Sequence, residues 1–447
     1  MIIKLIQPKM ALRPMDTKLK ARMAPALGLL TIANMFYNEH TVRIEDENAE
    51  DINFDEPVDL VGITVTVDVV NRAAEIAKIF REKGIPVVAG GIHITAFPEE
   101  SAKYFDAVCV GLAEKAWPDI VKDCESEQLK NIYRCDGKIK GSDILSPAYH
   151  LIDRSKYLYC NIVSTSRGCP FQCDFCYNSC EAYKNFYINR PIEDVVADIR
   201  AIGKRHIMFI DDNFIGNPKW TLAFVRAILP MHLKWNAAVS ANIADMPELL
   251  DEMKQSGCQS LFIGFESLNS KSIASVHKKQ NNIAKFEKLV KEVHKRGIMI
   301  NASFVFGLDA DDATTFQTTL NWIVKNKIET VTSHILTPYP GTKVHDDYVK
   351  SGRIIEYDLS KYNTANVVFQ PQNMSPKELY DGYLWIYKKV YSTKNIFKRI
   401  PQAKEQWVPY LLFNFIYRKY GKITSKLCEW ITYERMGRIA EKLSYHL

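Results

Sequence analysis

The stretch Ile162-Val-Ser-Thr-Ser-Arg-Gly-Cys169-Pro-Phe-Gln-Cys173-Asp-Phe-Cys176-Tyr-Asn-Ser-Cys180 decides the fold of this 447-residue chain. It opens with a short apolar run, Ile162–Thr165, which predicts a buried strand. Glycine, proline and aspartate then interrupt the pattern and predict a loop. Four of the ten cysteines of the chain lie in this loop, and the other six are scattered. We therefore expect the chemistry of the protein at the end of this strand.

Downstream of this strand, short apolar runs alternate with helical patterns as far as residue 365. Six strand–helix repeats predict a partial or complete βα barrel of the TIM type, with catalytic groups at the carboxyl ends of the strands. The predicted strands are Ile162–Thr165, Ile207–Ile210, Trp235–Val239, Ser260–Gly264, Met299–Phe306 and Val331–Leu336.

The first 135 residues show the same alternation in a separate unit, which predicts an α/β, doubly wound, Rossmann-like parallel sheet. Ligands of such sheets bind beyond the carboxyl ends of the strands. We expect strands at Ile2–Ile6, Thr41–Ile44, Leu60–Val67, Pro86–Gly91 and Ala107–Val110. The predicted parts of the chain are the Rossmann-like domain (1–135), a linker (136–160), the barrel (161–365) and a C-terminal helical region (366–447).

The cysteine loop has the composition of a metal site, because clustered cysteines in a cytosolic chain are reduced thiols or metal ligands. Three thiolates can bind three irons of a four-iron cluster and leave the fourth iron open for chemistry. Zinc is the alternative. Structural zinc sites usually combine two Cys-x-x-Cys pairs across a longer loop, whereas this loop has one pair, Cys173 and Cys176. The spacing therefore favours iron and sulfur.

The pattern Cys169-x-x-x-Cys173-x-x-Cys176 after a first barrel strand resembles the signature loop of the radical S-adenosylmethionine (radical SAM) superfamily. The resemblance implies that the three cysteines bind a 4Fe-4S cluster, whose open iron is chelated by S-adenosylmethionine. Phe175 would pack against the adenine, and Cys180 would have no ligand role. The implied reaction is reductive cleavage of S-adenosylmethionine to a 5′-deoxyadenosyl radical, which abstracts hydrogen from an unactivated carbon.

Later strand ends also resemble the family in order and placement. Asp211 and Asp212 end the second strand, where the family holds the amino group of S-adenosylmethionine, although the usual Gly-Gly-Glu is absent. The other cofactor-binding residues that the resemblance implies are Glu266 and Ser267 on the fourth strand and Asn301 and Ser303 on the fifth. The alternative for each is a polar side chain that only completes the hydrogen bonds of a strand end.

The first domain resembles the cobalamin-binding domain that precedes many radical SAM barrels. The resemblance rests on Ala26–Ala33, Val42–Asp46, Ala89-Gly90-Gly91-x-His93-x-Thr95-x-x-Pro98 and Gly111–Glu114. Gly90 and Gly91 would let the backbone approach a bulky ligand, and His93 and Thr95 could donate to it. The Asp-x-His-x-x-Gly element is absent, so no lower axial histidine is expected. The alternative is a domain that kept this fold without the cofactor.

The C-terminal region carries the basic excess of the chain. Residues 394–447 hold eleven Lys and Arg against four Asp and Glu, a balance of +7, in a chain of net charge +6. Ser375 and Glu378 predict a helix start with a capping box. A helical lid on the barrel, a surface that contacts an anionic membrane, and a nucleic-acid surface are three interpretations of this region. The lid is favoured and nucleic acid is disfavoured.

These inferences predict a cytoplasmic, anaerobic enzyme, with contact at a membrane surface as an alternative location. No run of 18 apolar residues predicts a membrane-spanning helix. The expected reaction is cobalamin-dependent methyl transfer to an unactivated carbon of a hydrophobic or amphipathic small-molecule or lipid-like substrate. The resemblance also implies a low-potential electron donor such as flavodoxin or ferredoxin. The alternatives are radical rearrangement, cyclisation, oxidation or coupling, and a non-catalytic cluster-bearing sensor or nucleic-acid-binding protein.

Overall fold

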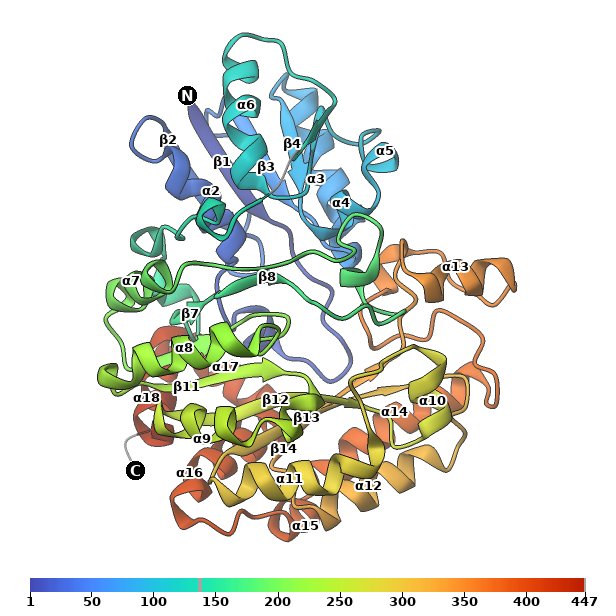
Figure 1. The fold of residues 1–447 in the computed structure, drawn as a ribbon. Helices are drawn as coiled ribbons and strands as arrows, with labels where there is room; N and C mark the ends of the chain where they lie inside the picture. Colours follow the sequence, from blue (N-terminus) through green and yellow to red (C-terminus); the bar gives the residue numbers. More distant parts are fainter. Residues whose placement is uncertain (136–138, 446–447) are drawn as a thin grey trace.

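The computed structural model describes residues 1–135 and 139–445, which form two parallel sheets with their helices, one above the other (Figure 1). Residues 136–138, the start of the predicted linker, lie outside the described part. The first sheet has the order β2-β1-β3-β4-β5-β6 and all its strands are parallel. Its strands are β1 (Ile2–Gln7), β2 (Thr41–Asp46), β3 (Leu60–Thr64), β4 (Val87–Gly90), β5 (Ala107–Val110) and β6 (Ile132–Arg134).

The first sheet confirms the predicted doubly wound fold and adds the edge strand β6, which is too short and too polar to predict. Helix α3 (Val70–Glu82) packs its apolar side on one face, and α2 (Leu27–Phe36) and α6 (Ala113–Glu125) cover the other. The short helices α4 (Ile92–Ala96) and α5 (Pro98–Ser101) follow β4. The strand order reverses between β1 and β3, so the crevice at their carboxyl ends is the expected ligand site.

The second sheet has six parallel strands in the order β14-β13-β12-β11-β10-β7. Within the described residues β7 and β14 are not paired with each other, so the barrel is partial. The strands are β7 (Ile162–Val163), β10 (His206–Phe209), β11 (Lys234–Val239), β12 (Cys258–Glu266), β13 (Met299–Phe306) and β14 (Thr330–Ile335). Strand β7 is shorter than expected because β8 (Ser166–Gly168) turns away and pairs antiparallel with β9 (Tyr187–Asn189).

Helices cover the outer face of the second sheet (Figure 1). They are α7 (Ile192–Ile202), α8 (Pro218–Ile228), α9 (Pro247–Gln255), α11 (Phe286–Lys295) and α12 (Thr315–Lys325), with α10 (Ser270–Ser275) and α13 (Lys343–Lys350) in the loops. Trp235 is fully buried and its ring lies 5.5 Å from that of Phe209 at a steep angle. Each such side chain contributes about 1.5–3 kcal/mol on burial. This aromatic core holds the strands that carry the site.

The C-terminal region is helical, as predicted, and starts with the predicted capping box of Ser375 and Glu378. It comprises α14 (Pro376–Val390), α15 (Thr393–Lys398), α16 (Trp407–Leu411), a π-helical segment (Leu412–Lys419), α17 (Gly421–Ile431) and α18 (Tyr433–Tyr445). Tyr391 follows α14 and completes the hydrogen bonds of the edge strand β14, since its hydroxyl accepts from the Val331 amide and donates to the Val331 carbonyl. Side chains therefore close the edge that no strand covers.

The segment between β1 and α2 connects the two sheets. Figure 1 shows this dark-blue segment, which includes α1 (Lys18–Ala21), extending from the first sheet toward the second. Arg13 donates to the Thr364 hydroxyl over 3.1 Å, and Lys18 lies 2.9 Å from the Glu429 carboxylate. In the part of the chain that the structure describes, no helix is both long and apolar enough to span a bilayer.

We predict that Tyr391→Phe lowers the free energy of unfolding by about 1–3 kcal/mol, because the buried Val331 amide and carbonyl lose their partner. Tyr357, which is 79% exposed, supplies the matched control Tyr357→Phe, with no expected change. Urea unfolding followed by fluorescence measures both variants. Equal midpoints for the two variants would contradict this role of Tyr391.

Candidate active site

The cysteine loop begins directly after β8 and lies at the carboxyl end of the second sheet. Cys169, Cys173 and Cys176 are free thiols, and the three interact electrostatically. Cys173 is buried, and burial raises the pKa of all three, that of Cys176 to about 12. A metal must therefore displace their protons on binding. In the described residues no three His, Cys, Asp or Glu side chains converge closely enough to hold a single metal ion.

A buried carboxylate fixes the start of this loop. Asp211, which follows β10, accepts four hydrogen bonds at one oxygen: from the amides of Thr165 (2.8 Å) and Ser166 (2.6 Å) and from their hydroxyls (3.1 and 2.7 Å). Burial raises the pKa of Asp211, and these hydrogen bonds oppose that effect. Its other oxygen is buried and has no partner among the described residues. Asp211, which the sequence predicts to contact a cofactor, therefore holds the chain segment that leads to Cys169.

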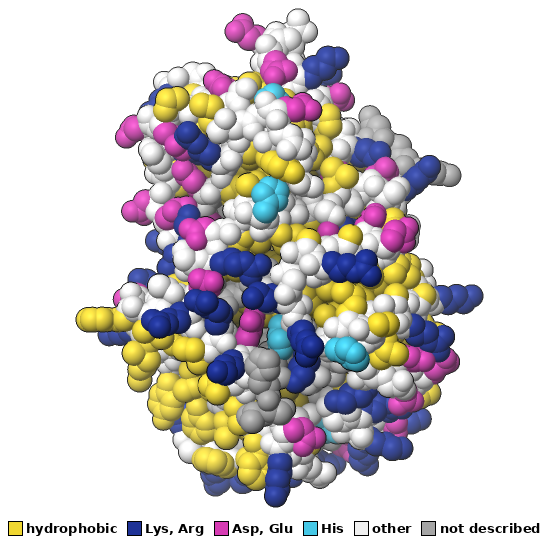
Figure 2. Space-filling model, turned by 90° about the vertical axis from the view of Figure 1, so that its left-hand side faces the viewer, with side chains coloured by type: hydrophobic (Ala, Val, Ile, Leu, Met, Phe, Trp, Pro, Cys, Tyr) yellow, Lys and Arg dark blue, Asp and Glu magenta, His cyan; other side chains and the backbone are white. Residues whose placement is uncertain are grey.

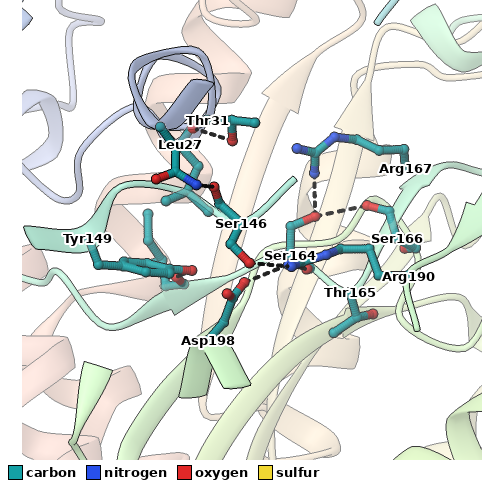
Figure 3. Close-up of polar contacts among 12 residues, drawn as sticks. Leu27, Thr31, Ser146, Tyr149, Ser164, Thr165, Ser166, Arg167, Arg190 and Asp198 are labelled. Atoms are coloured by element: carbon teal, nitrogen blue, oxygen red, sulfur yellow. Dashed lines mark hydrogen bonds and ion pairs between the residues drawn. The ribbon is translucent and has the colours of Figure 1, made fainter. Parts of the chain in front are cut away.

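A second buried network lies beneath the same strands (Figure 3). Arg190 pairs with Asp198 over 2.7 Å, and both side chains are almost fully buried. The guanidinium also donates to the Ser164 carbonyl (3.0 Å) and to the hydroxyl of Ser146 in the linker (3.2 Å). Arg167 donates to the Ser164 hydroxyl. The linker, β7 and β8 are therefore tied together by charge-assisted hydrogen bonds.

Glu266 lies where β12 bulges, and its backbone is left-handed with φ 64°. A non-glycine residue rarely adopts this conformation, and such strain is concentrated at functional sites. Its carboxylate forms a buried ion pair with Lys278, and Asn281 donates to the carbonyls of Gly264 and Phe265. Burial alone would lower the pKa of Lys278. Glu266 and the Cys173 thiol have the larger combined effect, so the pKa of Lys278 is raised.

The segment that carries Lys278 also covers the cysteine loop. Gln280 donates to the Cys173 sulfur over 3.3 Å, and His277 lies 2.7 Å from the Asp174 carboxylate. The positive charge of Lys278 lowers the pKa of Cys169 and Cys173, although burial outweighs it. A buried cation beside thiols favours their thiolate form. The sequence analysis missed Lys278, Gln280 and Asn281, which follow α10 in a loop without a motif.

Asp212 is the predicted acidic residue that faces the loop. Its carboxylate hydrogen-bonds Asn178 and acts electrostatically on Cys169 and Cys176, and burial raises its pKa. Phe175 is half-buried and packs against the barrel core. The structure therefore brings Asp212 and Phe175 to the cysteines, as expected from their sequence positions.

The remaining predicted barrel residues lie on neighbouring strands. Ser267 is buried and accepts a hydrogen bond from the Asn269 amide at 3.1 Å. Asn301 accepts from the Thr332 hydroxyl at 3.2 Å, and Ser303 lies two residues further along β13 and is buried. Their roles toward S-adenosylmethionine stay predictions, and the contacts of Ser267 and Asn301 are also those of ordinary strand-end residues.

A glycine turn, Gly90-Gly91, lies where β4 ends, at the carboxyl end of the first sheet. Gly91 has φ 110°, and a Cβ there would lie 2.8 Å from the Val65 carbonyl oxygen. Gly90 is less crowded, with its nearest such contact at 3.6 Å. Thr95 accepts from the Gly111 amide at 3.0 Å. His93 is buried, its Nδ1 has no partner in the described residues, and burial lowers its pKa to about 4. A neutral imidazole nitrogen is therefore left for a ligand.

The cysteine loop and the segment after the glycine turn are connected through the loop after β14. Tyr339 in that loop stacks on Tyr177, with ring centroids 4.7 Å apart, and the charge of Asp68 from the first domain acts on both phenols. A Cβ on Gly341 would lie 3.1 Å from the Phe97 ring. Phe97 in turn stacks on His93 at 5.8 Å. Aromatic side chains of both domains therefore connect the cysteine loop to His93.

Comparison with known families agrees with this geometry. The model of the radical SAM superfamily matches residues 163–323, and that of the B12 binding domain matches residues 21–121. The chain belongs to the radical SAM superfamily. It is a member whose barrel is preceded by a cobalamin-binding domain, and it is an enzyme.

Curated relatives span nearly the whole chain. A bacteriochlorophyllide d C-12(1)-methyltransferase of Chlorobaculum tepidum is 28% identical and covers 94% of this chain and 93% of its own. A hopanoid C-2 methylase of Rhodopseudomonas palustris is 27% identical over 77% of this chain and 68% of its own. The solved structure of the radical S-adenosylmethionine methyltransferase TsrM from Kitasatospora setae, with cobalamin and a [4Fe-4S] cluster, shares the fold (TM-score 0.69, 15% identity, 98% and 99% coverage).

The cofactors of this radical SAM enzyme are a 4Fe-4S cluster, S-adenosylmethionine and cobalamin. The residues present fit these groups. Three free thiols in one loop beside a buried cation suit a cluster with one open iron. The orphaned His93 nitrogen suits a ligand at this turn. Gly91 is crowded by the Val65 backbone, so glycine there lets β3 and the turn after β4 pack closely. No Asp-x-His-x-x-Gly element is present to supply an axial histidine.

We predict that Gly91→Ala reduces the cobalamin retained by the protein and lowers the free energy of unfolding by about 1–3 kcal/mol or more, because its backbone conformation and the Val65 carbonyl both disfavour a Cβ. Gly84→Ala is the matched control, since Gly84 also has positive φ (75°) but no atom within 4 Å. Cobalamin absorbance per chain and thermal unfolding report the two effects. Equal losses in both variants would show that the close approach at Gly91 is unimportant.

Proposed function

We propose that this enzyme transfers a methyl group to an unactivated carbon of a hydrophobic or amphipathic small molecule. The observation that carries the proposal is the connection of the cysteine loop to the segment after the glycine turn through Tyr177, Tyr339 and Gly341. When bound, the cluster supplies single electrons and cobalamin supplies methyl transfer, chemistry that side chains lack. A shared boundary lets both cofactors reach one substrate.

In this proposal the side chains of the chain bind, orient and exclude water. Cys169, Cys173 and Cys176 hold the cluster, and Lys278 lowers the cost of their negative charge. Asp211 holds the strand end from which the loop starts. The stacked rings of Tyr177 and Tyr339 keep water from the boundary between the two cofactor sites. Glu266 and Ser267 lie at the carboxyl end of β12, and Asn301 and Ser303 lie within β13, on the strands on which S-adenosylmethionine would lie.

The substrate class follows from the relatives and from the site together. The relatives include enzymes named for bacteriochlorophyllide and for hopanoids, both large apolar compounds. We infer a polycyclic or lipid-like substrate for this chain and a low-potential flavodoxin or ferredoxin as its electron donor. Radical cyclisation is the second candidate, because an anaerobic magnesium-protoporphyrin IX monomethyl ester cyclase of Cereibacter sphaeroides is 24% identical over 76% of this chain.

We predict that Cys169→Ala, Cys173→Ala or Cys176→Ala each abolishes the four-iron cluster, of which roughly four irons and four sulfides per chain are expected in the wild type. Formation of 5′-deoxyadenosine should be lost with the cluster. Cys180→Ala, a nearby buried free cysteine, is the control and should keep both. Iron, sulfide and cobalamin analysis after anaerobic expression with added cobalamin, followed by a search for methylated products, tests the proposal. A full cluster without cobalamin would leave a radical enzyme and refute cobalamin-dependent methylation.

The C-terminal helix α17 has an exposed surface that suggests where the enzyme binds a lipid-like substrate. Ile423, Leu427 and Trp430 on α17 are 59%, 50% and 85% exposed and recur at helical spacing. Lys422 and Lys426 are exposed beside them. Figure 2 shows hydrophobic side chains gathered at the lower left of this face, near a group of Lys and Arg side chains. An exposed apolar stripe flanked by cations is typical of helices that lie in an anionic membrane surface. We infer peripheral contact with such a surface.

We predict that Leu427→Ser weakens binding to phosphatidylcholine vesicles containing phosphatidylglycerol by roughly tenfold, because it removes about 1.5 kcal/mol of apolar burial. Leu229→Ser, at a leucine that is 41% exposed on the barrel, is the matched control and should bind like the wild type. Co-sedimentation at two salt concentrations measures the affinity and its electrostatic part. Binding that is equal in both variants, or absent in the wild type, would refute membrane contact through α17.

A further inference from the structure

Basic side chains from distant parts of the chain gather on the inner face of the second sheet. Arg13 and Lys20 come from the segment between β1 and α2, His334 from β14 and Arg418 from the π-helical segment. The Thr364 hydroxyl lies 3.1 Å from both the Arg13 guanidinium and His334 Nδ1. Arg13, Lys20 and Arg418 all lower the pKa of His334, after burial as the main cause, to about 3. We call Arg13, Lys20, His334 and Arg418 the inner basic cluster.

The charges of the inner basic cluster do not balance. Asp16 is the carboxylate that acts on its members, and it is already paired with Arg13 at 2.7 Å. Within the described residues Lys20 and Arg418 have neither a hydrogen bond from their side chains nor an ion pair. His334 is neutral at physiological pH because its pKa is low. Arg418 is half-buried and its Nε is fully buried, and buried charges in proteins are normally paired. Its guanidinium, unpaired among the described residues and with Lys20 beside it, therefore indicates a place for an anion.

Unused hydrogen-bond donors lie at the same place. The Nε of Arg418 is buried without a partner in the described residues, and its guanidinium rests on the rings of Tyr391 (5.7 Å) and Tyr417 (5.3 Å). Tyr383 is fully buried, its hydroxyl also has no partner, and the charges of Arg13 and Arg418 act on it. The cation–π contacts hold the guanidinium without using its N–H groups. An oxygen anion would satisfy these donors.

The inner basic cluster is close to the reaction centre as well. The charge of Arg13 acts on Tyr339, and so does the Cys176 thiol. The same phenol therefore lies between the cysteine loop and the cluster. Asn301 and Thr332, which share a hydrogen bond on β13 and β14, are on the face of the sheet that carries His334. A molecule anchored at the cluster can extend along this face toward the cofactors.

We propose that the inner basic cluster binds an anionic oxygen group of the substrate, a carboxylate or a phosphate ester, while the apolar body of the substrate extends toward the cysteine loop. The inference rests on the proposed function for the position of the reacting carbon. It narrows the substrate to amphipathic molecules with at least one acidic group. Lys20 and Arg418 bind the anion, and Arg13, held by Asp16 and Thr364, keeps their field positive.

Three probes with one ring system test the anion site on the full-length holoenzyme: 2-naphthoate, 2-naphthyl phosphate and 2-naphthol. We expect at least one of the two anions to bind more tightly than 2-naphthol, and the tighter anion identifies the class. Lys20→Met and Arg418→Gln should each weaken the anion about tenfold, as the loss of one charged hydrogen bond does, and leave 2-naphthol unchanged. Lys291→Met, at an exposed lysine on α11, is the matched control and should bind all three probes like the wild type.

The outcomes separate the anion site from the proposed function. Naphthol that binds as well as both anions, or equal effects of Lys20→Met and Lys291→Met, would overturn the anion site even if S-adenosylmethionine is still cleaved. Lys20 has an exposed side chain, so Lys20→Met tests the site even if Arg418→Gln fails to fold. Thermal unfolding of each variant separates a lost ligand contact from lost stability. Intact anion binding in a protein without methyl transfer would refute the proposed function alone.

Discussion

Four hydrogen bonds to one oxygen of Asp211 determine where the cysteine loop starts. The strand that leads to the loop is short and turns away from the sheet, so its own ladder cannot position Cys169. The buried carboxylate replaces the missing strand contacts with stronger, charge-assisted ones. From this anchor the loop extends toward Lys278 and Asp212, and the aromatic pair of Tyr177 and Tyr339 connects it to the first domain.

Much of the fold was predictable because its signals are local. Apolar runs of four to eight residues with helices between them predict parallel strands, and all six barrel strands agree with the structure to within about two residues. The first, which starts at Ile162, is shortened to two residues because Asp211 and the β8–β9 pairing bend the chain. Strand β6 and the π-helical segment were not predicted, since both depend on tertiary packing and have no periodic signal of their own.

The sequence predicted the parts of the site that belong to a local motif. It did not predict the charged residues that reach the site only through tertiary contacts. The cysteine spacing and the glycine turn indicate their chemistry directly, and Phe175 and Asp212 lie beside the cysteines as expected. Lys278 is one of many lysines in the sequence, and only its burial against Glu266 makes it distinctive. Arg418, too, became distinctive only through its place in the structure. It belongs to a basic tail that suggests a solvent-exposed surface, yet it lies under aromatic rings against the barrel.

The edge of β14, where the hydroxyl of Tyr391 takes the place of a neighbouring strand, has an evolutionary consequence. The C-terminal helices meet the sheet through side chains and not through a shared backbone ladder. They can therefore diverge, shift or be exchanged without disturbing the strand register that aligns the cofactors. The strand register then depends on the barrel strands themselves, and the C-terminal helices need only keep the contacts of a few side chains such as Tyr387, Tyr391 and Arg399.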